Sequence, residues 1–254
     1  MLAQVPLDGL IALLLASIRA GAWLIVAPPF DSRLLPTPVK ALLSVAISLP
    51  VVPSIAAHVP ATTVPALLAS AVEQMVVGAA LGFIAALIFS AVQAAGDLID
   101  LFGGINLSFA FDPFSMSQSS IFGRLYHLLA ITLLFASDGY QMVLHGFLLS
   151  YRTLPLDGTL PVSTVDRILT YELPAMFVAA LQIAGPLIAV LFCADVALGL
   201  LNRVAPALNA FALGFPAKIL LTLVLAGSAI MVLPESVRSL VTELVRAILG
   251  AAGG

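Results

Sequence analysis

Long apolar runs, separated by short segments rich in proline, glycine and charged residues, follow one another along the whole chain. Most of them reach or exceed the roughly 20 residues that a helix needs to cross the hydrocarbon core of a bilayer. The pattern therefore predicts an all-α integral membrane protein with about six apolar helical segments. These segments cover residues 7–27, 39–57, 66–102, 121–151, 173–201 and 208–233.

Several of these runs depart from a simple membrane span. Pro50 and Pro53 lie inside the second run, and because each removes a backbone donor, we expect a kinked or broken helix there. The third run is nearly twice as long as one span, so it either protrudes far beyond the bilayer or folds back on itself. Pro186 interrupts the fifth run, and Pro216 lies inside the sixth. We therefore expect several kinked or hairpin-like segments.

The segments between and after these runs differ in character. Residues 103–120 form a loop with several phenylalanines but few aliphatic residues, and residues 152–167 form a polar linker. Residues 235–250 predict an amphipathic helix, which we expect on a membrane surface or on a partner. We treat residues 1–254 as a single membrane domain. The apolar face of the amphipathic helix consists of Val237, Leu240, Val241, Leu244, Val245 and Ile248.

Composition excludes two broad classes of protein. The chain is 61% hydrophobic and 9% charged, whereas an ordinary soluble domain is about 45–50% apolar and about 25% charged. Ten basic and thirteen acidic side chains cannot cover the surface of a soluble domain of this size, so a soluble enzyme is excluded, and so is disorder. The net charge of −3 is spread thinly, and no basic run indicates a nucleic-acid partner.

No catalytic, cofactor-binding or metal-binding motif is recognisable in the sequence. It contains no phosphate-binding Walker loop, no dinucleotide-binding glycine fingerprint, no H-E-x-x-H and no G-x-S-x-G. The histidines His58, His127 and His145 are isolated from one another and from Cys193, and their spacing matches no metal site. We therefore expect no cofactor, no metal and no enzymatic activity.

Ionisable residues inside the apolar runs are the first candidates for function, because charge at membrane depth is costly and usually faces a bundle interior, a cavity or a partner. Glu73 is notable, since its run stays largely apolar for more than twenty residues after it. For several of the others, Arg203 in particular, a position at the water interface is the alternative. We expect buried charges or subunit contacts at Glu73, Asp100, Asp195, Arg203 and Lys218.

Two further features concern packing and closure. Gly78 and Gly82 form a G-x-x-x-G pattern, which lets two helix backbones approach closely. In residues 103–120, two glycines give the backbone freedom at the end of the third run, and the bulky apolar residues after them are able to close an opening by excluding water. Composition alone favours the simpler interpretation, a re-entrant loop that fills space.

These residues, taken with their neighbours, resemble the FliR family of flagellar export-gate proteins and its SctT counterparts in virulence secretion systems. The similarity runs through nearly the whole chain in the same order, although Asp138-Gly139-Tyr140 and Ala207 depart from the family pattern. The matching stretches are Pro29-Phe30-x2-Arg33-x2-Pro36-x3-Lys40-x2-Leu43, Glu73-x4-Gly78-x3-Gly82-Phe83, Gln93-x2-Gly96-x2-Ile99-Asp100 followed by Gly104 and Asp112-Pro113, Ser150-x3-Leu154-Pro155, and Pro186 with Asp195-x3-Gly199-x3-Arg203-x2-Pro206-x2-Asn209-x-Phe211 and Gly214-x-Pro216-x-Lys218.

The resemblance implies a non-enzymatic subunit of the flagellar type III export gate, which forms part of the channel for unfolded flagellar proteins. It implies FliP-like and FliQ-like membrane subunits in a hetero-oligomer, FlhB-like and FlhA-like export components, and a multi-pass position in the bacterial inner membrane at the flagellar basal body. The lipid bilayer is then a further partner, and nucleic acid is not. The resemblance also implies a plug in residues 103–120, formed by Gly103, Gly104, Asn106, Phe109, Phe111, Asp112, Pro113, Phe114 and Met116.

Alternatives to a flagellar gate subunit remain open from the sequence. The virulence (injectisome) branch of the same family is one. A small-solute transporter or channel is another, although such proteins usually contain inverted repeats or paired discontinuous helices and no repeat is recognisable here. A membrane-embedded enzyme needs titratable residues that converge on one pocket, whereas the histidines of this chain are dispersed.

Overall fold

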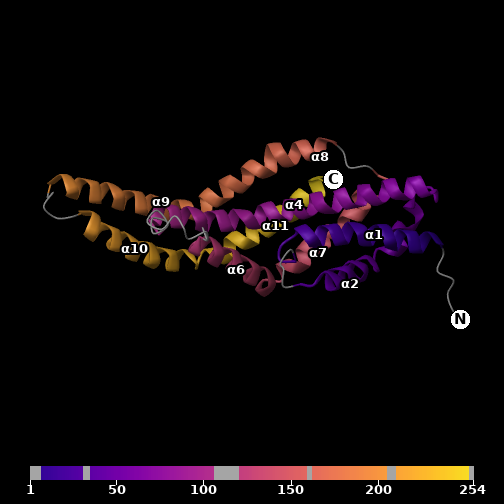
Figure 1. The fold of residues 1–254 in the computed structure, drawn as a ribbon, viewed down its shortest axis with the longest axis horizontal. Coiled ribbons are helices and arrows are strands. Elements are labelled where there is room, and N and C mark those ends of the chain that lie inside the picture. Colours follow the sequence, from indigo (N-terminus) through magenta and orange to yellow (C-terminus); the bar gives the residue numbers. More distant parts are fainter. Residues whose placement is uncertain (1–6, 31–34, 106–119, 159–161, 205–209, 252–254) are drawn as a thin grey trace. The chain divides into compact units, whose positions relative to one another are not determined.

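The computed structural model describes residues 7–30, 35–105, 120–158, 162–204 and 210–251, and every regular element in these ranges is a helix. This confirms the predicted all-α fold (Figure 1). The helices are α1 (Leu7–Val26), α2 (Thr37–Ser48), α3 (Val52–Ile55), η1 (Ala56–His58), α4 (Val64–Gly103), α6 (Ile121–Ala136), α7 (Gly139–Thr153), α8 (Val162–Arg167), η2 (Ile168–Glu172), α9 (Leu173–Val204), α10 (Ala210–Ala229) and α11 (Leu233–Ala251).

The number of candidate membrane spans agrees with the prediction. Three uninterrupted helical stretches are long and apolar enough to cross a membrane, namely α1, α4 and Ile168–Val204. Three broken helix pairs, α2 with α3 and η1, α6 with α7, and α10 with α11, raise the number to six if each pair forms one span. The bend of 64° between Thr37–Ser48 and Val52–His58 confirms that the prolines break the second run.

Contacts divide the chain into two compact units. Unit 1 comprises Met1–Ile88, Asp138–Pro174 and Leu240–Gly254, and unit 2 comprises Phe89–Ser137 and Ala175–Ser239. The helices α4, α9 and α11 each contribute residues to both units. The single membrane domain expected over residues 1–254 stays a prediction.

Some helices break at different places from those that the sequence predicts. The third run forms one unbroken helix of 40 residues, so it does not fold back on itself. The interruption expected at Pro186 is wrong, because α9 continues through this proline; membrane helices tolerate a proline when neighbouring groups accommodate the freed backbone carbonyl. The fourth run instead breaks at Asp138, whose φ of 56° is left-handed and ends the helical geometry.

The C-terminal amphipathic helix does not present its apolar face to a membrane surface or to a partner. Leu240, Leu244 and Ile248 are buried inside the chain, and Val245 packs beside Gly146 of α7. The expected location is therefore wrong. A helix with a strong apolar face buries it on the nearest apolar surface, and here that surface belongs to unit 1 itself. The expected polar linker 152–167 is also partly helical, since α8 begins at Val162.

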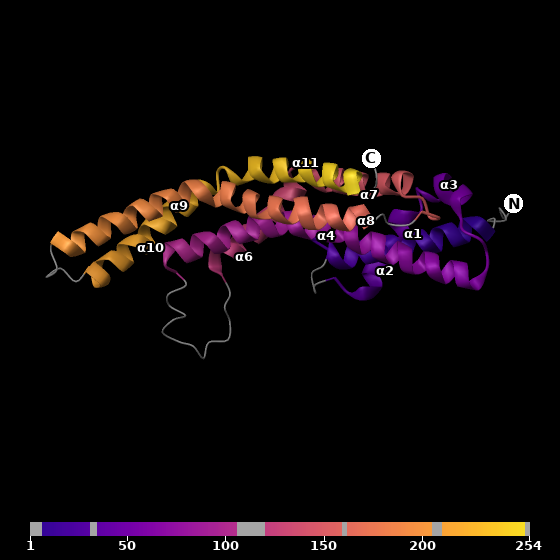
Figure 2. The ribbon, with the colours of Figure 1, turned by 90° about the horizontal axis from the view of Figure 1, so that it is seen from above.

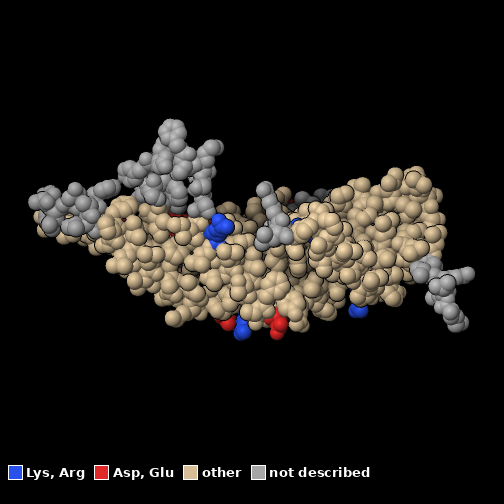
Figure 3. Space-filling model, turned by 60° about the horizontal axis from the view of Figure 1, so that its bottom comes forward, with Lys and Arg blue, Asp and Glu red and all other residues tan. Residues whose placement is uncertain are grey.

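The core of unit 1 is built on aromatic and small residues of α1, α4 and α7. Trp23 of α1 stacks on Phe147 of α7 with ring centroids 4.6 Å apart. The same α1 runs beside the first part of α4 (Figures 1 and 2), where the two backbones come close at Gly78 and Gly82. The surface drawn in Figure 3 carries charged side chains at only a few places, as expected for a chain surrounded largely by lipid or by other membrane helices.

Candidate functional site

A buried arginine joins three helices of unit 1. Arg19 of α1 is completely buried, and its Nε donates a hydrogen bond to Gln74 Oε1 of α4 at 2.6 Å. Its two terminal nitrogens donate to the carbonyl oxygens of Ser150 at 3.2 Å and Leu154 at 2.8 Å. The guanidinium carbon also lies 4.4 Å from the ring centroid of Tyr151. One side chain thus contacts α4 and the end of α7 at the same time.

The geometry explains why a cation is tolerated at this place. Ser150 and Leu154 lie at the C-terminal end of α7, where the helix dipole favours positive charge. The Ser150 carbonyl also accepts a hydrogen bond from the Leu154 backbone N–H at 2.9 Å, so it is shared between the helix and Arg19. Tyr151 Oη donates to the carbonyl of Ala16 at 2.8 Å, which ties α7 back to α1. In the described part of the chain no carboxylate forms an ion pair with Arg19, and its polar contacts are with two carbonyl oxygens, one amide and an aromatic ring.

The two glycines of the G-x-x-x-G pattern lie where α4 meets α1. A Cβ atom on Gly78 would overlap the backbone carbonyl of Arg19. A Cβ on Gly82 would lie 2.9 Å from Val26 Cβ and 3.1 Å from the Trp23 carbonyl oxygen. Both positions therefore need glycine for close helix approach, as the sequence pattern predicts.

Glu73 has a different environment from its neighbour Gln74. The Glu73 side chain is half-buried, and among the described residues it forms no hydrogen bond and no ion pair. Gln74 points inward, where it accepts from Arg19 and donates to the Leu156 carbonyl at 3.2 Å. The sequence analysis named the acidic residue of this pair as the candidate and missed the amide.

In unit 2, Asp100 connects the end of α4 to the start of α6. Asp100 is fully buried, and its Oδ2 accepts hydrogen bonds from the Ser120 hydroxyl and, at 2.9 Å, from the Phe122 backbone N–H. The Ser120 hydroxyl oxygen in turn accepts from Gly123 N–H at 2.8 Å, which makes Ser120 the N-cap of α6. We call these contacts of Asp100 with Ser120 and Phe122 the Asp100 clamp. It holds the end of α4 beside the start of α6, the two described helices that flank residues 106–119.

Glycines allow α4 and α6 to meet closely at the clamp. A Cβ on Gly96 would overlap the Phe122 carbonyl, and a Cβ on Gly123 would overlap the Asp97 carboxylate. Carboxylates placed at the first turn of α6 also complement the positive end of its dipole. The two helices are thus fixed to each other next to the segment that the resemblance identifies as a plug.

Gly103 and Gly104 have separate roles at the end of α4. A Cβ on Gly103 would lie 2.6 Å from Thr222 Cγ2 and 2.9 Å from its hydroxyl oxygen, so glycine is required here by the approach of α10. Gly104 has a φ of 76°, a conformation that glycine adopts without strain. The other plug residues, Asn106, Phe109, Phe111, Asp112, Pro113, Phe114 and Met116, lie outside the described residues.

Asp195 and Lys218, which the sequence analysis named separately, lie together. Lys218 Nζ of α10 is 2.6 Å from Asp195 Oδ1 and 2.8 Å from Oδ2 of α9. The lysine side chain is 14% exposed and the aspartate side chain 44% exposed. This pair joins α9 to α10 within unit 2. Arg203, near the end of α9, is exposed and forms no interaction with any described residue.

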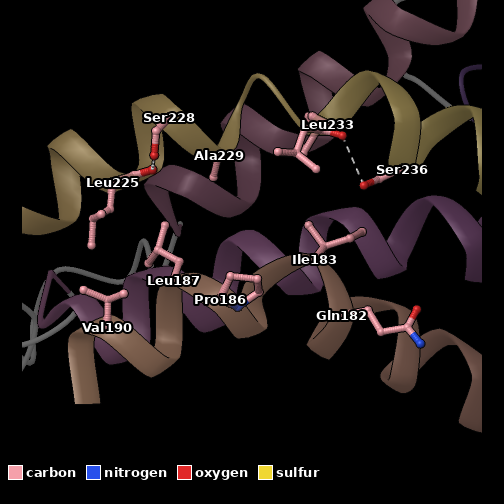
Figure 4. A pocket seen from close by; sticks show the side chains of 11 residues that line it. Gln182, Ile183, Pro186, Leu187, Val190, Leu225, Ser228, Ala229, Leu233 and Ser236 are labelled. Atoms are coloured by element: carbon pink, nitrogen blue, oxygen red, sulfur yellow. Dashed lines mark hydrogen bonds between the residues drawn. The ribbon is translucent and has the colours of Figure 1, made fainter. Parts of the chain in front are cut away.

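A cavity of about 300 Å³ lies beside Pro186 in unit 2. Figure 4 shows its side chains coming from α9 on one side and from α10 and the start of α11 on the other. The Ser228 and Ser236 hydroxyls donate to carbonyl oxygens of their own chain segment, at 2.7 Å to Leu225 and 3.3 Å to Val232. The cavity is therefore mainly apolar and presents no set of polar groups that converges on a substrate.

The described residues contain no group of histidine, cysteine or carboxylate side chains that would hold a metal ion. Their polar groups form helix-to-helix contacts, and no nucleophile with an adjacent base is found among the contacts above. The arrangement of these described side chains binds helices to one another.

Comparison with known proteins decides the family. The family model described as "Bacterial export proteins, family 1" matches residues 10–244. The chain belongs to the FliR family of bacterial export proteins. It is 34% identical over 203 residues to "Flagellar biosynthetic protein FliR" of Escherichia coli, a match that covers 78% of this chain and 76% of that protein. It is 31% identical over 231 residues to the FliR of Pectobacterium carotovorum, with 89% and 87% covered.

A relative from a different secretion system is also similar to this FliR-family chain. It is 33% identical over 153 residues to "Secretion system apparatus protein SsaT" of Salmonella typhimurium, which covers 59% of this chain and 58% of that protein. The flagellar relatives are therefore matched over a larger part of the chain.

Sequence reasoning missed several residues of this FliR-family chain that the structure brings together. Arg19, Gln74 and Tyr151 carry no motif, because the arginine bonds mainly to backbone carbonyls, which every residue has. One signal was available: Arg19 is the only charged residue within an otherwise apolar first run after Asp8. A cation in such a position has to find acceptors on other helices.

Proposed function

We propose that this FliR-family chain is a non-enzymatic membrane subunit of the flagellar type III protein-export gate, through which unfolded flagellar proteins cross the bacterial inner membrane. The observation that carries the proposal is the match of residues 10–244 to a bacterial export family together with the long matches to flagellar FliR proteins. Its polar clusters join helices, which suits a subunit whose role is to form a wall and to assemble.

The proposed partners are FliP-like and FliQ-like membrane subunits, with FlhB-like and FlhA-like export components in the same machine. A tagged copy of the chain, extracted from its native membrane in mild detergent, tests this. Mass spectrometry of the purified material should find FliP-like and FliQ-like proteins in fixed proportion to the chain. An unrelated multi-pass protein with the same tag is the control. Recovery of the chain alone, as one monodisperse species, would contradict the proposal and would favour solute transport.

We further propose that residues 103–120 act as the plug of the gate. Support comes from the Asp100 clamp, which holds the end of α4 beside the start of α6, the two described helices that flank residues 106–119. Deletion of residues 104–116 should make membranes leaky to ions and small solutes in cells that assemble the gate. Membrane permeability equal to that of the intact chain, with normal complex yield, would contradict the plug.

The injectisome is the second candidate system, and the similarity to SsaT supports it. The two systems differ in what the cell loses when the gene is deleted. Loss of motility and of exported flagellin supports the flagellar assignment, whereas loss of secreted virulence proteins with normal motility supports the injectisome.

A further inference from the structure

The depth of Glu73 in the membrane follows from contacts inside unit 1. The helix α1 has 20 residues, or about 30 Å at the usual rise, which matches the thickness of the hydrocarbon core. Arg19 lies about two turns from the end of α1 at Val26, and its Nε is 2.6 Å from Gln74 Oε1. Taken as a membrane span, α1 therefore places Gln74 within the hydrocarbon region, and Glu73 is its direct neighbour on the same helix.

The described part of the chain offers no counter-charge to this carboxylate. Among the described residues, Glu73 has neither an ion-pair partner nor a hydrogen-bond donor. Two basic side chains inside apolar helices already have partners elsewhere. Arg19 binds carbonyl oxygens and Gln74, and Lys218 pairs with Asp195. A half-exposed carboxylate at membrane depth with no donor is costly, which indicates that another molecule supplies one.

The surface beside Glu73 is a helical stripe of exposed apolar side chains on α4. We call it the α4 outer stripe. Its residues recur at helical spacing on the side of α4 opposite to Gln74 and Gly78, and Glu73 borders it one turn before Val76. The stripe consists of Leu68, Val72, Val76 and Phe83.

We propose that the α4 outer stripe binds a transmembrane helix of a different subunit, and that this helix carries a lysine or arginine that pairs with Glu73. Apolar side chains alone would suit lipid chains equally well, but an acyl chain offers nothing to a carboxylate. A basic side chain on a packed helix satisfies both the stripe and the charge. The inference rests on the proposed function, because the partner is taken to be a membrane subunit of the same gate.

Site-specific photo-crosslinking tests the partner. A photoreactive amino acid replaces Val76, an exposed stripe residue one turn after Glu73, in the tagged full-length chain, which is expressed in its native membrane with the rest of the machine. The crosslinked product should contain a different membrane protein, joined through a helix that includes a lysine or arginine. Crosslinks only to lipid, to a second copy of this chain or within the chain itself would overturn the proposal.

Substitution of Glu73 tests the charge. Glu73→Leu should lower both the crosslink and the recovered complex about tenfold or more, because it leaves the partner's cation buried without an acceptor. Glu243→Gln, at an exposed carboxylate on α11, is the matched control and should change neither. If lipid surrounds Glu73, leucine should be neutral or should raise the yield, and that result would overturn the proposal.

Two measurements keep the result interpretable. Trp23 stacks on Phe147, so its fluorescence reports whether unit 1 of the Glu73→Leu chain is folded. We expect a native signal, because Glu73 forms no hydrogen bond or ion pair with a described residue. The two charges are also exchanged, with glutamate in place of the partner's crosslinked basic residue and Glu73→Lys in this chain. This exchange should restore the yield of the complex, and a yield that stays low would count against a direct pair. If the intact chain recovers no gate subunits at all, the proposed function has failed; if it recovers them but Glu73→Leu does too, only this inference has failed.

Discussion

Replacement of Arg19 by lysine separates the geometry of the buried guanidinium from its charge. Lysine keeps a positive charge at this position, although its ammonium group is more strongly hydrated than a guanidinium and therefore costs somewhat more to bury. Its compact ammonium group, however, cannot reach acceptors on α4 and at the end of α7 at the same time, as the planar guanidinium does. We therefore expect the Arg19→Lys chain to fold but to be less stable.

The size of the effect follows from the contacts. Arg19 donates three hydrogen bonds, and a lysine at this position should keep one of them. Hydrogen bonds between membrane helices contribute about 0.6 kcal/mol on average and up to about 1.7 kcal/mol each. The free energy of unfolding should therefore fall by about 1–3 kcal/mol.

The chain contains its own probe for this measurement. Trp23 is the only tryptophan, and it stacks on Phe147 of α7 at 4.6 Å, so its fluorescence reports the packing of α1 on α7. The purified chain is unfolded by titration with sodium dodecyl sulfate in mild detergent. Arg152→Lys, at an exposed position in the last turn of α7, is the matched control and should stay within about 0.5 kcal/mol of the original chain. Equal midpoints for Arg19→Lys and Arg152→Lys would refute the reasoning.

Three further substitutions test other contacts. Gly78→Val should lower the free energy of unfolding by about 1–3 kcal/mol, because the new side chain overlaps the backbone of α1, and unfolding monitored by Trp23 fluorescence measures this. Gly185→Ala has open space around it and should be neutral or stabilising, which the temperature of thermal aggregation measures. Asp100→Ala should speed amide hydrogen exchange in the first turn of α6 by about tenfold, since a buried N–H loses its acceptor, and Asp100→Asn should do so less. Lys218→Met should cost about 1–2 kcal/mol, and adding Asp195→Leu should recover part of it; strictly additive effects would show that the two residues do not interact.

Much of the fold could be predicted from the sequence, because apolar length and proline position are local properties. The helical class, the number of apolar segments and the break near Pro50 and Pro53 follow directly from them. The continuity of α9 through Pro186 could not be predicted, since it depends on what surrounds the freed carbonyl. The break at Asp138 depends on one residue in a left-handed conformation, for which the sequence shows only an aspartate before a glycine.

The candidate site was also predictable from the sequence only in part. Charges within apolar runs identified Asp100, Asp195 and Lys218, because any charge at such a place needs a partner. The sequence does not show that Asp195 and Lys218 form an ion pair within one chain, or that Glu73 forms no hydrogen bond or ion pair with any described residue. The Arg19 contacts were missed because backbone carbonyls leave no trace in a sequence.

The length of α4 has a consequence for how the chain assembles. Its 40 residues span about 60 Å, twice the hydrocarbon thickness of about 30 Å. To fit entirely within the bilayer, α4 would need a tilt of about 60°, whereas observed tilts reach only about 40°. Part of this apolar helix must therefore meet water or other protein. Helices inside lipid gain no hydrophobic free energy by associating. A part of α4 that protrudes into water does gain it when another protein covers its apolar side chains. Assembly is thus favoured by hydrophobic mismatch, and a thicker bilayer should weaken that contribution.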